Sequence, residues 1–200
     1  MHYFTEISPL VKEMELRQQP VIITVNEFTE ESVQKFNEQM CLAQNSGQKV
    51  IPIEIDSYGG QVYSLMSMIS SIKTSRIPVA TIVQGKAMSC GAILASFGSE
   101  GLRFMDRDST MMIHDVSSYA FGKIEELKSD VREAERLNRK VYTMMARNCG
   151  KPDDYFTNLI HDKGHSDWFL EAEEAKEHGL IDHVRVPEMK IKVEVNITVE

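Results

Sequence analysis

The sequence predicts an α/β fold in which helices cover a mainly parallel sheet, and two observations support this prediction. Short β-branched apolar runs alternate along the chain with longer segments whose apolar residues recur at helical spacing. Glycine or small-residue turns separate the runs from these segments, and parallel neighbours in a sheet need such crossovers. A chain of 200 residues can bury its own core, so we expect one domain over residues 1–200.

The N-terminal half of the sequence predicts three successive strand–helix pairs. Runs rich in Val and Ile predict the strands, and the spaced apolar residues that follow each run predict the helices. The strands are expected at 21–25, 50–55 and 79–83, the helices at 29–45, 62–72 and 89–97, and a turn at 84–88.

One long helical pattern, over residues 123–148, dominates the C-terminal half and ends at Gly150. Such a helix is about 39 Å long at 1.5 Å per residue, so an intersubunit role and a position across the sheet both remain open. Around it the sequence predicts a strand at 110–114, helices at 153–160 and 171–178, and a one-face strand at 189–199. Residues 1–19 form a separate N-terminal segment.

The composition argues against several classes of protein. No apolar run approaches the roughly 20 residues of a membrane helix, and the first 20 residues do not resemble a secretory signal. We therefore expect a cytoplasmic protein without a membrane partner. The net charge of -8 argues against nucleic acid as a partner. The three cysteines, Cys41, Cys90 and Cys149, are an odd and scattered set, which we interpret as free thiols.

The histidines and glycines predict no cofactor and no metal site. His161 and His165 are four residues apart, but Gly164 intervenes and no third ligand follows them in the sequence. The glycine patterns that bind phosphates and dinucleotides are missing. His178 and His183 flank a helix stop and are interpreted as cap and surface residues.

Ser89 is the candidate nucleophile. It lies between a buried strand and a small-residue helix, where free backbone N–H groups stabilise developing negative charge. Serine is also a preferred helix N-cap, so this position alone also fits a structural role. Gly59 and Gly60 follow the preceding parallel strand, at the edge where ligands bind, although two glycines also suit a positive φ. If the two strands are neighbours, the N–H groups of Gly60 and Cys90 converge as an oxyanion hole.

His114 and Asp167 are the candidate base and orienting carboxylate. His114 ends a short strand, and an imidazole there can accept a proton near neutral pH. Asp167 precedes an apolar Trp-Phe pair, a setting in which a carboxylate needs a partner such as an imidazole N–H. A buried histidine bonded to backbone and a capping aspartate are the structural alternatives.

Taken in order, these segments resemble the ClpP family of caseinolytic serine proteases, within the wider ClpP/crotonase fold, from about residue 21 to 184. Residues 55–60 are similar to the family's strand and Ser-Pro-Gly-Gly turn, with Tyr58 where proline is usual. Residues 85–92, 112–114 and 166–182 resemble the nucleophile, histidine and aspartate segments.

The resemblance implies a fold of repeated β-β-α units with a protruding handle helix at 123–149. It also implies a serine endopeptidase, ATP-independent in itself, that cleaves unfolded polypeptides and short peptides through an acyl-enzyme inside an oligomeric chamber. Ser89, His114 and Asp167 would form the triad, and the amides of Gly60 and Cys90 the oxyanion hole.

The same resemblance implies partners. The chain would form heptameric rings that stack through the handle helix into a double ring, and an AAA+ unfoldase would dock on the ring face. An extended peptide would pair with a groove, and the groove residues are Gly59, Gly60, Val116, Ser117, Ser118 and Tyr119.

Some residues depart from the family pattern. Charged and polar residues at the positions of the unfoldase pocket predict weak or altered coupling; these positions are Pro52, Glu54, Gln84 and Asp106. Asp115-Val116 replaces the usual Gln-Pro after the histidine, and Ser166 replaces an arginine that helps rings to pair. A single ring and a stacked double ring therefore both remain open.

Three other functions remain open from the sequence. A crotonase-like enzyme acting on acyl-CoA would share the fold without needing a serine nucleophile. A Ser-Lys peptidase would use Lys86 as its base, although His114 is present and no membrane segment is evident. A non-catalytic assembly protein would keep the fold and lack turnover.

Overall fold

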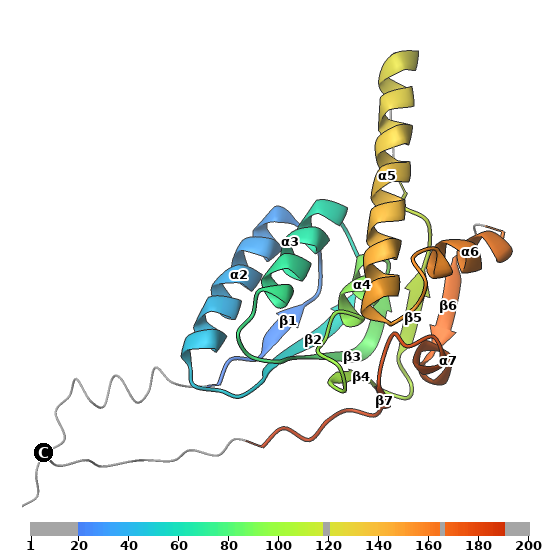
Figure 1. Ribbon diagram of the computed structural model, residues 1–200. Helices are drawn as coiled ribbons and strands as arrows, with labels where there is room; N and C mark the ends of the chain where they lie inside the picture. Colours follow the sequence, from blue (N-terminus) through green and yellow to red (C-terminus); the bar gives the residue numbers. More distant parts are fainter. Residues whose placement is uncertain (1–19, 118–120, 165–166, 191–200) are drawn as a thin grey trace, which may run out of the picture.

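A mainly parallel sheet covered by helices forms the core of the computed structural model, which describes residues 20–117, 121–164 and 167–190 (Figure 1). The sheet order is β1-β2-β3-β4-β7, with parallel pairing; β5 pairs parallel with β3, and β6 pairs antiparallel with β5. The strands are β1 (Ile23–Val25), β2 (Ile51–Ser57), β3 (Val79–Met88), β4 (Arg103–Met105), β5 (Thr110–Ile113), β6 (Trp168–Glu171) and β7 (His183–Val184). This arrangement confirms the predicted α/β fold.

The central strands β2 and β3 are buried over most of their length. Ile51, Ile53 and Ile55 are all fully buried on β2, and Val79 and Val83 are buried on β3. Near-continuous apolar strands are typical of parallel sheets, because helices cover both of their faces. The strong burial fixes the β2–β3 register, and this register determines which residues meet at the carboxyl edge.

Two helices of the N-terminal half, α2 (Glu30–Asn45) and α3 (Val62–Lys73), lie side by side on the sheet (Figure 1). A reciprocal cap begins α2, since the Thr29 hydroxyl accepts from the Ser32 N–H at 3.1 Å and the Ser32 hydroxyl accepts from the Thr29 N–H at 2.9 Å. The next helix, α4 (Cys90–Ala95), is short and completely buried.

The turn predicted at 84–88 is wrong, because β3 continues through these residues to Met88. The strand changes partners there: residues 81–83 pair with β4, and residues 86–88 pair with β5. Gly85 provides the change of direction with a φ of 90°, and its N–H donates to the Ser109 hydroxyl at 2.8 Å. The glycine therefore marks a bend within a strand and not its end.

The longest helix, α5 (Ile124–Asn148), has two unlike halves. Its C-terminal half packs into the core through Leu137, Val141, Tyr142, Met145 and Ala146. Its N-terminal half projects away from the rest of the described residues (Figure 1), and Ile124 and Val131 there are 71% and 56% exposed. The first half of α5 therefore projects and the second half packs into the core, while the intersubunit role stays a prediction.

The remaining helices are α6 (Tyr155–Asp162) and α7 (Ala172–Glu177), close to the predicted positions. The sequence did not predict β4, β6 and β7, which have only two to four residues each and too little pattern to detect. The strand predicted at 189–199 lies, from residue 191 on, outside the described residues, as does the N-terminal segment 1–19. No helix among the described residues has the length and apolar character needed to cross a bilayer.

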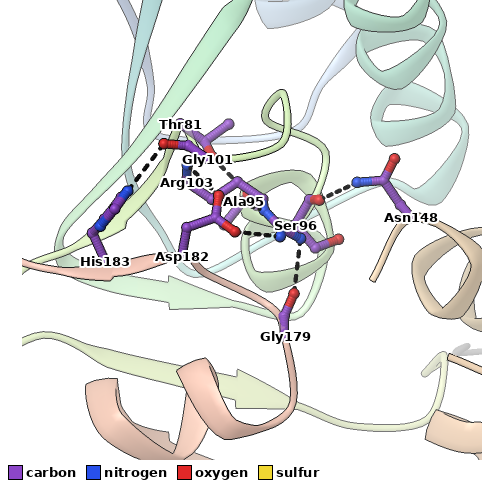
Figure 2. A network of polar contacts seen from close by, with 9 residues as sticks. All are labelled: Thr81, Ala95, Ser96, Gly101, Arg103, Asn148, Gly179, Asp182 and His183. Atoms are coloured by element: carbon purple, nitrogen blue, oxygen red, sulfur yellow. Dashed lines mark hydrogen bonds and ion pairs between the residues drawn. The ribbon is translucent and has the colours of Figure 1, made fainter. Parts of the chain in front are cut away.

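A partly buried polar network connects the C-terminal segment to the sheet (Figure 2). Arg103 of β4 donates from Nε to Asp182 Oδ2 at 3.0 Å and from Nη1 to the Gly179 carbonyl at 2.8 Å. Burial opposes the charge of Arg103, but the hydrogen bonds to Asp182 more than offset this and raise the pKa of the guanidinium. His183 adds a contact to the Gly101 carbonyl at 3.0 Å. The network positions β7 beside β4 and lies apart from the catalytic candidates.

Candidate active site

Ser89 stands at the junction of β3 and α4 in a strained backbone conformation. Its φ of 53° and ψ of -118° make it the one residue other than glycine with a positive φ among those the structure describes. Its N–H donates to the Met112 carbonyl of β5 at 2.8 Å, and its own carbonyl accepts from the Ile93 N–H of α4 at 3.2 Å. Backbone strain of this kind persists only where the surrounding structure enforces it. A sharp strand-to-helix turn also exposes the serine hydroxyl for nucleophilic attack.

His114 faces this serine directly. The distance from His114 Nε2 to Ser89 Oγ is 2.9 Å, a normal hydrogen bond. The sheet explains why these side chains meet. Met88 pairs with Met112 on the neighbouring strand, and Ser89 and His114 follow these two residues by one and two positions, so both lie at the same edge of the sheet. When the neutral imidazole carries its proton on Nδ1, Nε2 accepts from the serine hydroxyl.

Asp167 lies on the other side of the imidazole at a longer distance. Ile113 pairs with Trp168 in the antiparallel β5–β6 ladder, so the next residues, His114 and Asp167, lie opposite each other. His114 Nδ1 and Asp167 Oδ1 are 3.7 Å apart, which is an ion-pair separation and too long for a hydrogen bond. The Asp167 side chain is 56% exposed, against 22% for His114.

The Gly59-Gly60 turn packs against the nucleophile. A Cβ added to Gly59 would lie 2.8 Å from Ser89 Cβ and 3.3 Å from the Cys90 nitrogen, so only glycine fits there. The Cys90 thiol donates to the Gly60 carbonyl at 3.3 Å, and burial raises the pKa of this thiol to about 11. The structure thus brings both residues of the expected oxyanion hole next to Ser89, with Cys90 as a neutral thiol.

The predicted groove residues are only partly within the described chain. Gly59, Gly60, Val116 and Ser117 are described, whereas Ser118 and Tyr119 lie outside the described residues. The Val116 N–H donates to Asn138 Oδ1 of α5 at 3.0 Å. This N–H is therefore already used inside the protein.

Lys86 does not suit the role of a base. Its Nζ lies 2.6 Å from Asp56 Oδ1 and 4.3 Å from the centre of the Tyr58 ring. The hydrogen bond to Asp56 raises the pKa of the Lys86 ammonium, although desolvation opposes this, so the amine stays protonated near neutral pH. A Ser-Lys mechanism needs a neutral amine and is not supported.

The other histidines have structural surroundings. His178 Nδ1 lies 2.9 Å from the Tyr155 hydroxyl, and burial lowers the pKa of its imidazole. His183 stacks on Phe104 at 4.9 Å between ring centres. His165 lies outside the described residues, and within the described ranges no group of three His, Cys, Asp or Glu side chains could hold a metal ion.

Sequence reasoning missed two residues of α5 that touch the His114 segment. The Tyr142 hydroxyl donates to the His114 carbonyl, and Asn138 Nδ2 donates to Asp115 Oδ1 at 2.6 Å. A signal was present, since Asn138 and Tyr142 are four residues apart and therefore place two polar groups on one face of the helix, beside the apolar stripe. The stripe alone could not show which strand end they would meet.

The comparison with known families agrees with this geometry. The sequence model described as Clp protease matches residues 10–188, a range that includes the serine, the histidine, the aspartate and the glycine turn. The match covers most of the chain and confirms the resemblance drawn from the motifs. The chain therefore belongs to the Clp protease family.

Proposed function

We propose that the protein is a serine endopeptidase of the cytoplasm in which Ser89 is the nucleophile, His114 the general base and Asp167 the group that orients the base. The observation that carries the proposal is the 2.9 Å contact between Ser89 Oγ and His114 Nε2 at a strained strand-to-helix turn. A nucleophile and a base within hydrogen-bond distance are the minimum for this chemistry.

The reaction follows from these positions. His114 Nε2 takes the hydroxyl proton as Ser89 Oγ attacks the peptide carbonyl carbon, and the carbonyl oxygen becomes an oxyanion. The N–H groups of Gly60 and Cys90 stabilise this oxygen. The protonated imidazole then gives its proton to the leaving amine, which leaves an acyl group on Ser89. Water, deprotonated by His114, hydrolyses the ester and restores the hydroxyl.

Asp167 is proposed to accept a hydrogen bond from His114 Nδ1–H and so to hold the imidazole in the tautomer whose Nε2 faces Ser89. The present 3.7 Å separation is about 0.8 Å longer than a hydrogen bond, and catalytic hydrogen bonds often tighten only when substrate is bound. The exposed side chain of Asp167 leaves room for such a shift.

The substrate is proposed to be an extended, unfolded polypeptide or a short peptide. Backbone groups after Val116 would pair with it on one side, and the Gly59-Gly60 turn would lie on the other. Because Asn138 already occupies the Val116 N–H, Val116 would offer only its carbonyl, and the expected groove residues Ser118 and Tyr119 lie outside the described residues.

We propose that the chains assemble into heptameric rings and that the rings stack through α5. Residues 124–135 of the helix carry five carboxylates and two basic side chains, whereas residues 136–148 carry four basic side chains and no carboxylate. An antiparallel pair of such helices from two copies would place acidic against basic halves. A groove of about 540 Å³ along the basic half offers a seat for the partner helix. Analytical ultracentrifugation should show a tetradecamer, and a single heptamer or smaller species would contradict stacking.

Coupling to a standard unfoldase is proposed to be weak. Glu54, Gln84 and Asp106 stand where an apolar socket would be needed, and Pro52 is buried. Nearby Phe104 is covered by Arg185, whose guanidinium lies 5.4 Å from the ring centre. Tight co-purification with an AAA+ unfoldase would contradict this proposal.

The decisive experiment compares the full-length protein with its Ser89→Ala variant. Hydrolysis of short fluorogenic peptides should fall by roughly 10⁴-fold or more in the variant, because the nucleophile is lost. A fluorophosphonate probe should label the unmodified protein and not the variant. A crotonase-like enzyme or a non-catalytic assembly protein would show no labelling, and equal hydrolysis by both proteins would remove Ser89 from the mechanism.

A further inference from the structure

We infer that Asn138 and Tyr142, both on α5, are positioning residues that hold the His114 imidazole on Ser89. This inference rests on the proposed peptidase function. The two side chains reach three successive residues, 114, 115 and 116, with one hydrogen bond each. Neither residue touches Ser89 in the contacts described, so each would act through the backbone that carries the base.

The sheet no longer holds the chain at these residues. Strand β5 ends at Ile113, and the β5–β6 ladder has its last pair at Ile113 and Trp168. The imidazole of His114 therefore projects from the first residue beyond the ladder. Beyond the end of the ladder, hydrogen bonds from helix α5 fix the direction of residues 114–116.

Tyr142 provides the inner contact. Its side chain is 1% exposed, and its hydroxyl donates to the carbonyl of His114 itself. A buried phenol needs a partner for its O–H, and this carbonyl is the partner. Burial raises the pKa of Tyr142, so the hydroxyl keeps its proton and remains a donor. The phenol thus fixes the peptide plane that follows the base.

Asn138 provides a two-part contact one helical turn away. Its Nδ2 donates to Asp115 Oδ1 at 2.6 Å, while its Oδ1 accepts from the Val116 N–H at 3.0 Å. One amide therefore recognises a carboxylate and a backbone donor on adjacent residues. An asparagine satisfies both, whereas an aspartate would repel the Asp115 carboxylate.

The pairing of an amide with a carboxylate suggests a test in which the two groups are swapped between positions 138 and 115. In Asn138→Asp the two carboxylates face each other, and we expect the turnover number kcat to fall by roughly 10- to 100-fold, because misplacing a catalytic group by about 1 Å can cost 10²-fold. In the double variant Asn138→Asp with Asp115→Asn, the new aspartate still accepts from the Val116 N–H and also accepts from the new amide. We expect kcat to return to within about 3-fold of the unmodified protein.

The matched control is Asn158→Asp on α6. Asn158 Nδ2 donates to Asp154 Oδ2 at 2.9 Å, so the same kind of contact is broken at an exposed position far from the base in sequence. We expect it to leave kcat unchanged. The rate of fluorophosphonate labelling of Ser89 should follow kcat in all four proteins, while KM stays within about 2-fold. Thermal unfolding and sedimentation must be measured on the same samples, since loss of fold or assembly would lower the labelling rate and kcat together.

The outcomes separate this inference from the proposed function. If the unmodified protein labels and hydrolyses, an unchanged kcat in Asn138→Asp, or a loss that the double variant does not restore, would overturn the inference. If Asn138→Asp does not fold, Tyr142→Phe decides, because it removes only one hydroxyl; an unchanged kcat there overturns the inference. If the unmodified protein neither labels nor hydrolyses, the proposed function fails. In that case amide hydrogen exchange at Val116 still reports the hydrogen bond to Asn138. If Val116 exchanged as fast in the unmodified protein as in the Asn138→Leu variant, this hydrogen bond would be contradicted.

Discussion

Two carboxylates of the C-terminal segment, Asp167 and Asp182, each face a cationic or potentially cationic side chain, but the two pairs are built differently. Asp182 accepts from the Arg103 side chain at 2.5 and 3.0 Å and from its backbone N–H at 2.9 Å, and its side chain is 18% exposed. Asp167 lies 3.7 Å from His114 Nδ1 and is 56% exposed. Asp182 is therefore held by three hydrogen bonds, whereas Asp167 lies near its partner without a hydrogen bond to it.

Under the proposed function, the difference separates a structural pair from a catalytic one. Arg103 is always charged and its side chain is largely removed from solvent, so a carboxylate fixed by hydrogen bonds is needed to compensate it at every stage. In the proposed reaction the His114 imidazole gains a positive charge when it takes the serine proton, and this is the step at which Asp167 would stabilise it. We therefore expect the Asp182 pair to determine stability and the Asp167 pair to determine rate.

The largest effect is expected on turnover, in Asp167→Asn. A buried and tightly held triad carboxylate contributes roughly 10⁴-fold to kcat, because its loss favours the wrong imidazole tautomer. For an exposed carboxylate at 3.7 Å we expect a smaller loss, of roughly 10²-fold, with an unchanged midpoint of thermal unfolding. Peptide hydrolysis and calorimetry check this, and a kcat within 2-fold of the unmodified protein would remove Asp167 from the mechanism.

The next effect is on stability, in Asp182→Asn. Breaking a buried pair by removing one partner costs about 3–5 kcal/mol, and because this pair is partly exposed we expect about 2–3 kcal/mol. Chemical denaturation measures the loss. The kcat of the folded fraction should stay within about 2-fold, and a large drop in kcat without a loss of stability would reverse the roles assigned to the two carboxylates.

The sequence predicted these two regions unequally. Ser89 and His114 stand at predicted strand ends and Asp167 precedes an apolar Trp-Phe pair, so motif order selected these three as candidates before any geometry was known. The Arg103–Asp182 pair joins residues 79 positions apart, and although Asp182 ends the segment that resembles the family's aspartate segment, nothing in the sequence pointed to Arg103 as its partner. Its partners became visible only when β4 and β7 were seen to be neighbours.

The same limit applies to α5 and to β3. The apolar stripe predicted the helix, but Asn138 and Tyr142 acquire a role only because the second half of the helix packs beside the end of β5. In β3 the glycine at 85 predicted a turn, whereas pairing to two different strands keeps residues 86–88 extended. In both cases tertiary contacts decided what local pattern left open.

A third effect concerns acid. Burial opposes ionisation of Asp182, but hydrogen bonds from Arg103 lower the pKa of this carboxyl below its ordinary value. A folded pKa below the unfolded one stabilises the fold above about pH 4, and this contribution is lost as the pH falls through the folded pKa. The difference in unfolding free energy between the unmodified protein and Asp182→Asn should therefore narrow from pH 5 to pH 3. A difference that stays constant over this range would contradict the assignment.

The smallest effect is expected at a third carboxylate, Glu173, which lies on α7 just after β6. Its Oε1 is 3.8 Å from Arg107 Nη2, almost the same separation as in the Asp167 pair, but both side chains are largely exposed at 63% and 76%. Solvent screens such a pair, and neither group takes part in the proposed reaction. Glu173→Gln should therefore leave both the unfolding midpoint and kcat unchanged, measured beside the other two variants. If its unfolding midpoint fell as far as that of Asp182→Asn, burial would not be what gives Asp182 its effect on stability.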